Sequence, residues 1–451
     1  MTAHGTAMAE KATFARGIHP PERKRFAADV PIKVLPTPSQ VRIALLQHLG
    51  APCEATVTPR SVVTLGEQIG QVGGFVSAPV HASISGTVGR QSMATLPNGR
   101  RVAVLPIDAD GEQPLQGDAL LQDMFGGDWP TEGLQQYEPQ QIADAAREAG
   151  LVGLGGAAFP THVKLTRNEK KPIDSLLING CECEPYLTAD DRLMRQSPES
   201  IVCGALLGQH ATGAGRVSVC IEDNKPEAIE AMQRAADSTD VTVCVLRTKY
   251  PQGGEKQLID AALGREVPCG GLPLDVGVVV INVTTAAALA RAVIRGKPLT
   301  HRVVTVTGAG IRLPKNLLVP IGAAYRDLIE CCGGLRDDAV RIVAGGPMMG
   351  FTFADLDTPV TKGTSGITAL SHYEVQRNVE TTCVRCGRCV DVCPMRLVPT
   401  KLALVARAGN EDLARRYHIS ACMECGCCAY TCPANLPLVQ LIRMGKVMAS
   451  K

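Results

Sequence analysis

The sequence predicts a multidomain α/β protein with four parts: an N-terminal β module, a parallel-sheet domain, a small α+β module and a helical, cysteine-rich C-terminal domain. Three observations support this prediction. Short β-like runs punctuated by Pro and Gly fill the first part, apolar strands alternate with helices in the middle, and cysteines gather near the end. A chain of 451 residues has room for about three domains and for a large core without disulfides.

The composition argues against nucleic-acid binding and against membrane spanning. The 46 Lys and Arg residues against 44 Asp and Glu give a net charge of +2, without the basic excess of a nucleic-acid binder. Aromatic residues, at 3%, are too few for a platform that stacks single strands, so no nucleic-acid partner is expected. The N-terminus lacks the apolar core of a signal peptide, and polar residues interrupt the longest apolar run, 276–294. We expect neither a signal peptide nor a transmembrane helix.

Residues 1–135 are expected to form the β module, because runs such as 61–65 and 101–105 are β-like and turn signals separate them. Residues 136–300 alternate between the two kinds of element. The expected helices are 139–150, 226–236, 255–263 and 286–295, and the expected strands are 175–178, 216–221, 241–246 and 276–283. Since these strands are almost wholly apolar, they predict a parallel sheet covered on both faces.

Residues 301–360 are expected to form the small α+β module. Strands are expected at 303–307 and 340–344, with a helix at 323–331 between them. A Gly/Thr-rich linker, 361–366, leads to the cysteine-rich domain, 371–451.

Eight cysteines form two runs with one spacing. The runs are Cys383-x2-Cys386-x2-Cys389-x3-Cys393-Pro394 and Cys422-x2-Cys425-x2-Cys428-x3-Cys432-Pro433. This is the spacing of two-cluster bacterial ferredoxins, in which the fourth cysteine of each run binds the other cluster. The predicted ligands are therefore Cys383, Cys386, Cys389 and Cys432 for cluster 1, and Cys422, Cys425, Cys428 and Cys393 for cluster 2. Each would be a [4Fe–4S] cluster.

Zinc is the competing metal, since pairs of cysteines two residues apart also bind Zn²⁺. A zinc site does not require the third and fourth cysteines or the proline, so two clusters are the better prediction. Cys427 does not fit the spacing and is expected to be a packing residue, like most of the other scattered cysteines. Residues 397–420 and 437–448 have helical patterns, which favours an all-helical ferredoxin domain.

A glycine-rich segment, 150–164, is the second strong feature. It contains Gly153, Gly155, Gly156 and, at its end, Lys164. A helix rather than a strand precedes it, so it is not a Rossmann fingerprint. Glycines let a backbone approach a ligand, consecutive amides can bind an anion, and the lysine suits a phosphate. The alternative is a tight turn without a ligand.

Polar residues follow three of the predicted strands. They are Asn179, Glu182 and Glu184 after the first, Glu222 and Asp223 after the second, and Asn282 and Thr284 after the fourth. Sites in parallel α/β sheets lie at the carboxyl ends of strands. Any one of these residues could cap a helix, but three sets at equivalent ends favour a shared ligand crevice.

The glycine-rich segment GLGGAAFPTHVK resembles the flavin and NADH loop of the NADH-dehydrogenase subunit of respiratory complex I, and INGCECEP is similar to its NADESEP segment. The resemblance implies that FMN and NADH are lined by Gly153, Gly155, Gly156, Lys164, Asn179, Glu182 and Glu184. Phe159 would help to form the nicotinamide pocket. Two positions depart from the pattern: Ala158 replaces a glycine and Cys181 replaces an aspartate.

The whole chain resembles the C subunit of the Rnf (Rsx) ion-translocating ferredoxin:NAD oxidoreductase complexes. The segments that carry this resemblance are 14–24, 77–88, 221–226 and 345–350. It implies a lipoyl-like barrel-sandwich module, a complex I-like FMN/NADH domain, an SLBB-like module and a two-cluster ferredoxin domain. It also implies a peripheral subunit on the cytoplasmic face of the bacterial inner membrane. Its partners would be the other subunits of the complex, among them an iron–sulfur subunit and integral membrane subunits.

The predicted function is electron transfer between NAD(H), FMN and two [4Fe–4S] clusters, coupled in the complex to ion translocation. The hydride is exchanged with the flavin, so no side chain is predicted to be catalytic. One alternative is a soluble NADH-dependent cobalamin reductase, a related family expected to lack the GIHPPE segment found here. Another is a flavin-free electron-wire or scaffold subunit.

Overall fold

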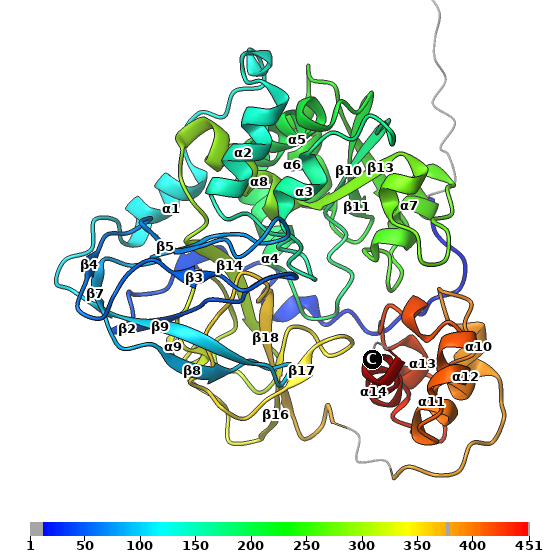
Figure 1. Cartoon of the computed structure of the whole chain (residues 1–451). Helices are drawn as coiled ribbons and strands as arrows, with labels where there is room; N and C mark the ends of the chain where they lie inside the picture. Colours follow the sequence, from blue (N-terminus) through cyan, green and yellow to red (C-terminus); the bar gives the residue numbers. More distant parts are fainter. Residues whose placement is uncertain (1–11, 376–378, 450–451) are drawn as a thin grey trace, which may run out of the picture.

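The computed structural model describes residues 12–375 and 379–449, which form four sheets and the helices around them (Figure 1). No helix within these two ranges is long and apolar enough to cross a membrane.

The N-terminal β module is confirmed as two small antiparallel sheets that share one core. The first has the order β2-β9-β7-β4, with β8 also pairing with β9, and the second has the order β3-β5-β6. Alternating apolar side chains from both sheets, such as Val41, Ile69 and Ile107, are completely buried between them. The strands are β2 (Gln40–Ala44), β3 (Glu54–Ala55), β4 (Val62–Val63), β5 (Gln68–Gln71), β6 (Val80–His81), β7 (Gly86–Val88), β8 (Ser92–Thr95) and β9 (Arg101–Ala109).

The central sheet is parallel, as the apolar strands predicted, and has the order β12-β11-β10-β13. Helices α4, α5, α6 and α8 contribute to the core on one face, and α7 packs on the other. The strands are β10 (Ser175–Asn179), β11 (Arg216–Glu222), β12 (Val241–Leu246) and β13 (Val278–Asn282). The helices of this region are α1 (Gly117–Phe125), α2 (Pro139–Glu148), α3 (Thr161–Leu165), α4 (Ala189–Gln196), α5 (Pro198–Thr212), α6 (Pro226–Ala236), α7 (Glu255–Leu263) and α8 (Val283–Arg295).

A six-stranded mixed sheet has the order β1-β15-β14-β18-β16-β17. Its elements are β1 (Ile32–Val34), β14 (His301–Thr307), β15 (Lys315–Pro320), α9 (Tyr325–Cys331), β16 (Ala339–Ala344), β17 (Phe351–Thr352) and β18 (Gly366–Ser371). Its members come from three of the expected parts of the chain, because β1 lies within the first 135 residues and β18 lies beyond residue 360. The boundaries at 135, 300 and 360 therefore stay a prediction about sequence units, while the sheet itself crosses two of them.

The C-terminal domain is helical, as predicted. Its helices are α10 (Arg388–Asp391), α11 (Pro399–Arg407), α12 (Glu411–Arg416), α13 (Cys427–Tyr430) and α14 (Leu438–Ala449). In Figure 1 its orange and red helices lie beside the blue N-terminal segment. This neighbourhood is direct, since the amide of Gly17 donates to the carbonyl oxygen of Val392 at 3.1 Å.

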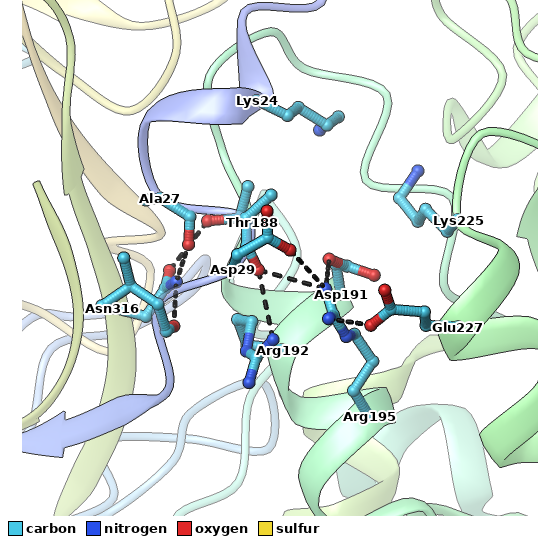
Figure 2. Close-up of polar contacts among 12 residues, drawn as sticks. Lys24, Ala27, Asp29, Thr188, Asp191, Arg192, Arg195, Lys225, Glu227 and Asn316 are labelled. Atoms are coloured by element: carbon cyan, nitrogen blue, oxygen red, sulfur yellow. Dashed lines mark hydrogen bonds and ion pairs between the residues drawn. The ribbon is translucent and has the colours of Figure 1, made fainter.

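The N-terminal segment is held between α4 and the six-stranded sheet (Figure 2). The Asn316 side chain donates to the carbonyl oxygen of Ala27 at 2.9 Å. Arg195 on α4 forms ion pairs with Asp29 at 3.6 Å and with Asp191 at 3.5 Å. These contacts fix the path of a segment that has almost no secondary structure of its own.

Residues 361–366, expected as a linker, are instead built into the interior. Lys362 is only 1% exposed, and its ammonium donates to the carbonyl oxygens of Pro79 and Gly150, each at 2.7 Å. One side chain thus ties the β module, the central domain and the start of β18 together. A composition rich in Gly and Thr resembles a linker, and only the tertiary contacts reveal the difference. Burial lowers the pKa of Lys362 to about 7.

We expect this lysine to make stability depend on pH. Its pKa is about 7 in the folded chain and lies near the ordinary 10.5 when unfolded, so between these values the unfolded state binds more protons and stability rises with pH. Relative to Lys362→Met, the wild-type free energy of unfolding should increase by about 2 kcal/mol from pH 7 to pH 9. Urea unfolding of both proteins at each pH measures this, and a constant difference between them would contradict it.

Candidate functional site

The carboxyl ends of β10 and β13 meet at a topological switch point. The chain runs outward from β10 to β11 and β12, then returns to place β13 on the other side of β10. Asn179 and Asn282 end these two strands and are register partners. The Asn282 amide donates to the carbonyl oxygen of Asn179 at 3.3 Å, and the Asn179 amide donates to that of Gly253 at 2.9 Å. Ligands of open α/β sheets bind at such a point.

The glycine-rich loop rests on this point. The amide of Gly153 donates to the carbonyl oxygen of Phe159 at 2.8 Å and closes the loop. A Cβ atom on Gly155 would lie 2.9 Å from Cβ of Asn282, so only glycine lets the backbone come this close. A Cβ atom on Gly156 would meet nothing within 4 Å. The tip of the loop is therefore exposed beside open space at the switch point.

Ala158 departs from the family pattern at a strained position. Its φ is 51°, in the left-handed region that favours the glycine it replaces. It is nevertheless 8% exposed, with its side chain in the core beneath the loop. The methyl group thus adds apolar contact where the backbone conformation is less favourable.

Lys164 lies at the back of the loop. Its ammonium donates to the Glu255 carboxylate at 2.7 Å and to the carbonyl oxygen of Val280 in β13 at 2.9 Å. The side chain is 29% exposed. The positive charge expected for a phosphate is present near the end of β13, and Glu255 balances it.

Asp190 belongs to the site, although we did not predict it. Its carboxylate accepts hydrogen bonds from the Asn282 amide at 2.7 Å and from the Thr284 hydroxyl at 2.8 Å. Its own amide donates to Glu182 at 2.8 Å. Burial raises the pKa of both Asp190 and Glu182. The signal that could have revealed it is the pair of acids at the start of a helix that follows the INGCECEP segment.

Part of this bonding is helix capping, the alternative we kept for the strand-end residues. Asn282 accepts from the amide of Thr284 at 2.9 Å and caps α8, and Glu182 accepts from the first amides of α4. Both side chains also remain partly exposed at the crevice. Capping therefore fixes their orientation and leaves surface available to a ligand.

Glu222 and Asp223 are directed elsewhere. Glu222 is 1% exposed, lies 3.2 Å from the Lys225 ammonium and accepts from the amide of Lys249 at 3.2 Å. Asp223 accepts from the amide of Thr248 at 3.0 Å. These bonds tie the end of β11 to the segment after β12, so both carboxylates have structural roles in this arrangement.

Glu184 points toward the C-terminal domain. Its carboxylate accepts from the amides of Met348 at 2.6 Å and Met349 at 3.0 Å, and it hydrogen-bonds with the Tyr250 hydroxyl. Burial raises its pKa. The structure thus gives the expected nucleotide ligand three protein partners, and its contact with NADH stays a prediction.

The residues at the crevice suit FMN. Exposed loop amides and the Lys164 ammonium can accept a phosphate, and the Asn179 and Asn282 side chains offer amide groups at the strand ends. Two further side-chain nitrogens, Nδ2 of Asn224 and Nε2 of Gln252, are buried without a hydrogen-bond partner among the described residues. Unpaired buried donors beside a crevice are what a polar ligand would satisfy.

The four cysteines assigned to cluster 2 line one cavity. Cys393, Cys422, Cys425 and Cys428 enclose it together with apolar side chains such as Leu402 and Ile442. Cys393, from the first motif, lies near the thiol of Cys425 in the second. The crossed assignment thus fits the geometry.

The cluster 1 cysteines lie nearer the surface. Cys389 is near Cys386 and Cys432, which again brings the fourth cysteine of one run to the other. Cys383 and Cys386 are exposed. Cys427 is fully buried and its sulfur lies 4.0 Å from the carbonyl oxygen of Tyr250, as suits a packing residue. No three His, Cys, Asp or Glu side chains in the described ranges converge on one ion. The ligands of a cubane cluster bind four different irons, so they surround a volume instead.

Family models match the chain in four places, in the order of the expected parts. Their descriptions are RnfC Barrel sandwich hybrid domain (residues 12–112), Nuo51 FMN-binding domain (146–291), SLBB domain (303–352) and 4Fe-4S dicluster domain (382–436).

Curated relatives match most of the chain, and each is the C subunit of an ion-translocating complex. That of the proton-translocating ferredoxin:NAD(+) oxidoreductase complex of Clostridium ljungdahlii is 42% identical over 401 residues, which are 89% of this chain and 85% of the relative. Its Na(+)-translocating counterpart from Acetobacterium woodii is 43% identical over 392 residues, 87% of this chain and 86% of the relative. That of the ion-translocating oxidoreductase complex of Rhodobacter capsulatus is 42% identical over 434 residues, 95% and 82% of the two chains.

A solved structure shares the fold. It is an NAD+-reducing [NiFe]-hydrogenase in the H2-reduced state, with a TM-score of 0.50 at 20% sequence identity, and the match covers 71% of this chain and 65% of that one. This likeness concerns the fold alone. The relatives and the order of the domain matches carry the assignment: the chain belongs to the family of C subunits of the Rnf-type ion-translocating ferredoxin:NAD(+) oxidoreductase complexes.

Proposed function

We propose that this chain carries electrons between NAD(H), bound with FMN at the switch-point crevice, and two [4Fe–4S] clusters in its C-terminal domain. One observation supports it most: a cavity lined by cysteines of both motifs lies against the same domain that holds the crevice. When bound, FMN supplies the step from a hydride to single electrons. The side chains position the ligands and keep water away.

The proposed roles follow the geometry of the crevice. Gly153, Gly155 and Gly156 present the loop backbone to FMN, and Lys164 with the loop amides faces its phosphate. Asn179 and Asn282 hold the two strand ends together beneath it. Phe159 and Glu182 would border the nicotinamide, with Asp190 fixing Glu182 through its amide.

Exposure suggests the order of the clusters. Cys393, Cys425 and Cys428 of cluster 2 are at most 8% exposed and face Tyr250 of the central domain. Cys383 and Cys386 of cluster 1 are exposed at the opposite, outer part of the motif. We place cluster 2 on the crevice side and cluster 1 on the side that meets the partner iron–sulfur subunit.

Within the complex, the electron transfer would be coupled to ion translocation by the integral membrane subunits. Two of the relatives are named as parts of proton- and Na(+)-translocating complexes. We place this subunit at the cytoplasmic face of the inner membrane, because NAD(H) is a cytoplasmic substrate. The test of the whole proposal is analysis of the anaerobically purified chain for iron, acid-labile sulfide and extractable flavin. A flavin-free chain would favour an electron-wire subunit.

The crossed ligation predicts the effect of Cys393→Ser. This change should destroy the cluster held by Cys422, Cys425 and Cys428, and about half of the iron should be lost. Iron analysis and electron paramagnetic resonance measure this. Cys427→Ser is the matched control, since Cys427 is buried in the same motif and should leave both clusters intact. Loss of the Cys383 cluster instead would show that the ligands are not crossed.

The phosphate role predicts that Lys164→Ala weakens FMN binding. Loss of one charge-assisted hydrogen bond should cost about 1.5–3 kcal/mol of binding free energy. Titration of the flavin-depleted chain with FMN, followed by fluorescence quenching, measures the change. Lys171→Ala is the control, because Lys171 is 46% exposed and pairs with Asp275 away from the loop. Equal affinities for both variants and wild type would remove Lys164 from the site.

A further inference from the structure

The C-terminal domain meets the central domain around its second cysteine motif. The Tyr250 hydroxyl donates to the carbonyl oxygen of Cys425 at 2.7 Å. Arg443 donates to the carbonyl oxygen of Met349 at 3.0 Å, in the Gly-Gly-Pro-Met-Met-Gly segment, 345–350. The interface is therefore built around the residues assigned to cluster 2.

Tyr250 has a fixed position in this interface. It is 2% exposed, and its backbone exchanges two hydrogen bonds of 2.9 Å with Ile18 of the N-terminal segment. Gly17, next to Ile18, cannot be larger, since a Cβ atom there would lie 2.6 Å from the carbonyl oxygen of Tyr250. With its backbone held on one side, the ring can reach only one place on the cysteine motif.

The hydroxyl of Tyr250 joins two groups that the proposed function needs. It donates to Cys425, a predicted cluster ligand, and it hydrogen-bonds with Glu184 at the end of the INGCECEP segment. Glu184 also binds the amides of Met348 and Met349. A Cβ atom on Gly426 would lie 2.7 Å from the carbonyl oxygen of Met348, so the same segment touches the motif from a second side.

We propose that Tyr250 is a positioning residue for cluster 2: its hydroxyl fixes the peptide group between Cys425 and Gly426 and thereby sets the reduction potential of that cluster. The inference rests on the proposed function, because it requires a cluster at Cys393, Cys422, Cys425 and Cys428. Hydrogen bonds and oriented dipoles around a cluster tune its potential, and outer contacts hold its ligands in place. Removing the hydroxyl frees a carbonyl whose peptide carries a ligand.

The test is Tyr250→Phe in the full chain, which removes one oxygen and keeps the ring. Dithionite titration followed by electron paramagnetic resonance should show both clusters, with the reduction equilibrium of cluster 2 changed roughly three- to tenfold, as expected for one hydrogen bond. A tenfold change is about 59 mV for one electron. Cluster 1 should titrate as in the wild type.

Tyr186→Phe is the matched control. Tyr186 is likewise buried, at 6% exposed, and its hydroxyl donates to Glu374 at 2.7 Å, not to a cysteine motif. Its clusters should titrate as in the wild type. The proposal is wrong if Tyr250→Phe leaves the cluster 2 potential unchanged, if the control shifts it equally, or if Tyr250→Phe loses both clusters. Selective loss of cluster 2 supports the proposal, because positioning has then failed at that site alone.

A second variant covers the case in which Tyr250→Phe does not fold. Glu184→Gln keeps the shape of the side chain and weakens its bonds to Met348 and Met349, so it should shift cluster 2 in the same selective manner. An unchanged potential there would overturn the proposal. Because dithionite needs neither NADH nor flavin, the titration separates this inference from the flavin part of the proposed function. A chain without flavin would contradict that part alone.

Discussion

The loop after β10 imposes the constraint on which much of the structure depends. Its backbone carbonyls turn inward where no strand or helix can pair with them, and unpaired buried carbonyls are costly. Lys24 solves this with one ammonium, which donates to the carbonyl oxygens of Glu182 at 2.7 Å, Glu184 at 3.2 Å and Leu187 at 2.6 Å. Lys24 must therefore lie beside the loop, and the N-terminal segment before it then runs past Tyr250 to the C-terminal domain. One buried cation thus connects the crevice with the cluster interface.

Local signals allowed much of the fold to be predicted. Helix α6 begins at Pro226 and α7 ends before Gly264, whose φ is 65°, and both helices have the predicted bounds. Helix α5 was missed because it is buried on nearly every side and lacks the polar face that marks an amphipathic helix. Strands β1 and β18 were missed for another reason. Each pairs with strands far away in the sequence, and a three-residue run such as Ile32–Val34 carries too little pattern to reveal this.

The site divides in the same way. The cysteine ligands follow from spacing, because a short loop limits which thiols can reach one cluster, and the structure groups them accordingly. The glycine-rich loop and strand ends also follow from local sequence. The partners of the carboxylates do not: Glu184 meets Met348 across 164 residues, and Asp190 meets Asn282 across 92. Which element meets a side chain is decided by packing of whole domains, so the roles of these carboxylates needed the structure.

The unequal burial of the two clusters gives the electron path a direction. A cluster becomes more negative on reduction, and burial away from water opposes the added charge, so the buried cluster 2 should have the lower potential and the exposed cluster 1 the higher. Arg443 and Lys446 lie beside cluster 2 and act in the opposite sense. Glu424 pairs with both, at 2.9 and 2.6 Å, which leaves one net positive charge of the three. Burial should therefore prevail, and an electron that enters from the crevice moves downhill toward the surface. The reverse flow, from the partner to NAD(+), then requires a donor strong enough to reduce cluster 2 through cluster 1.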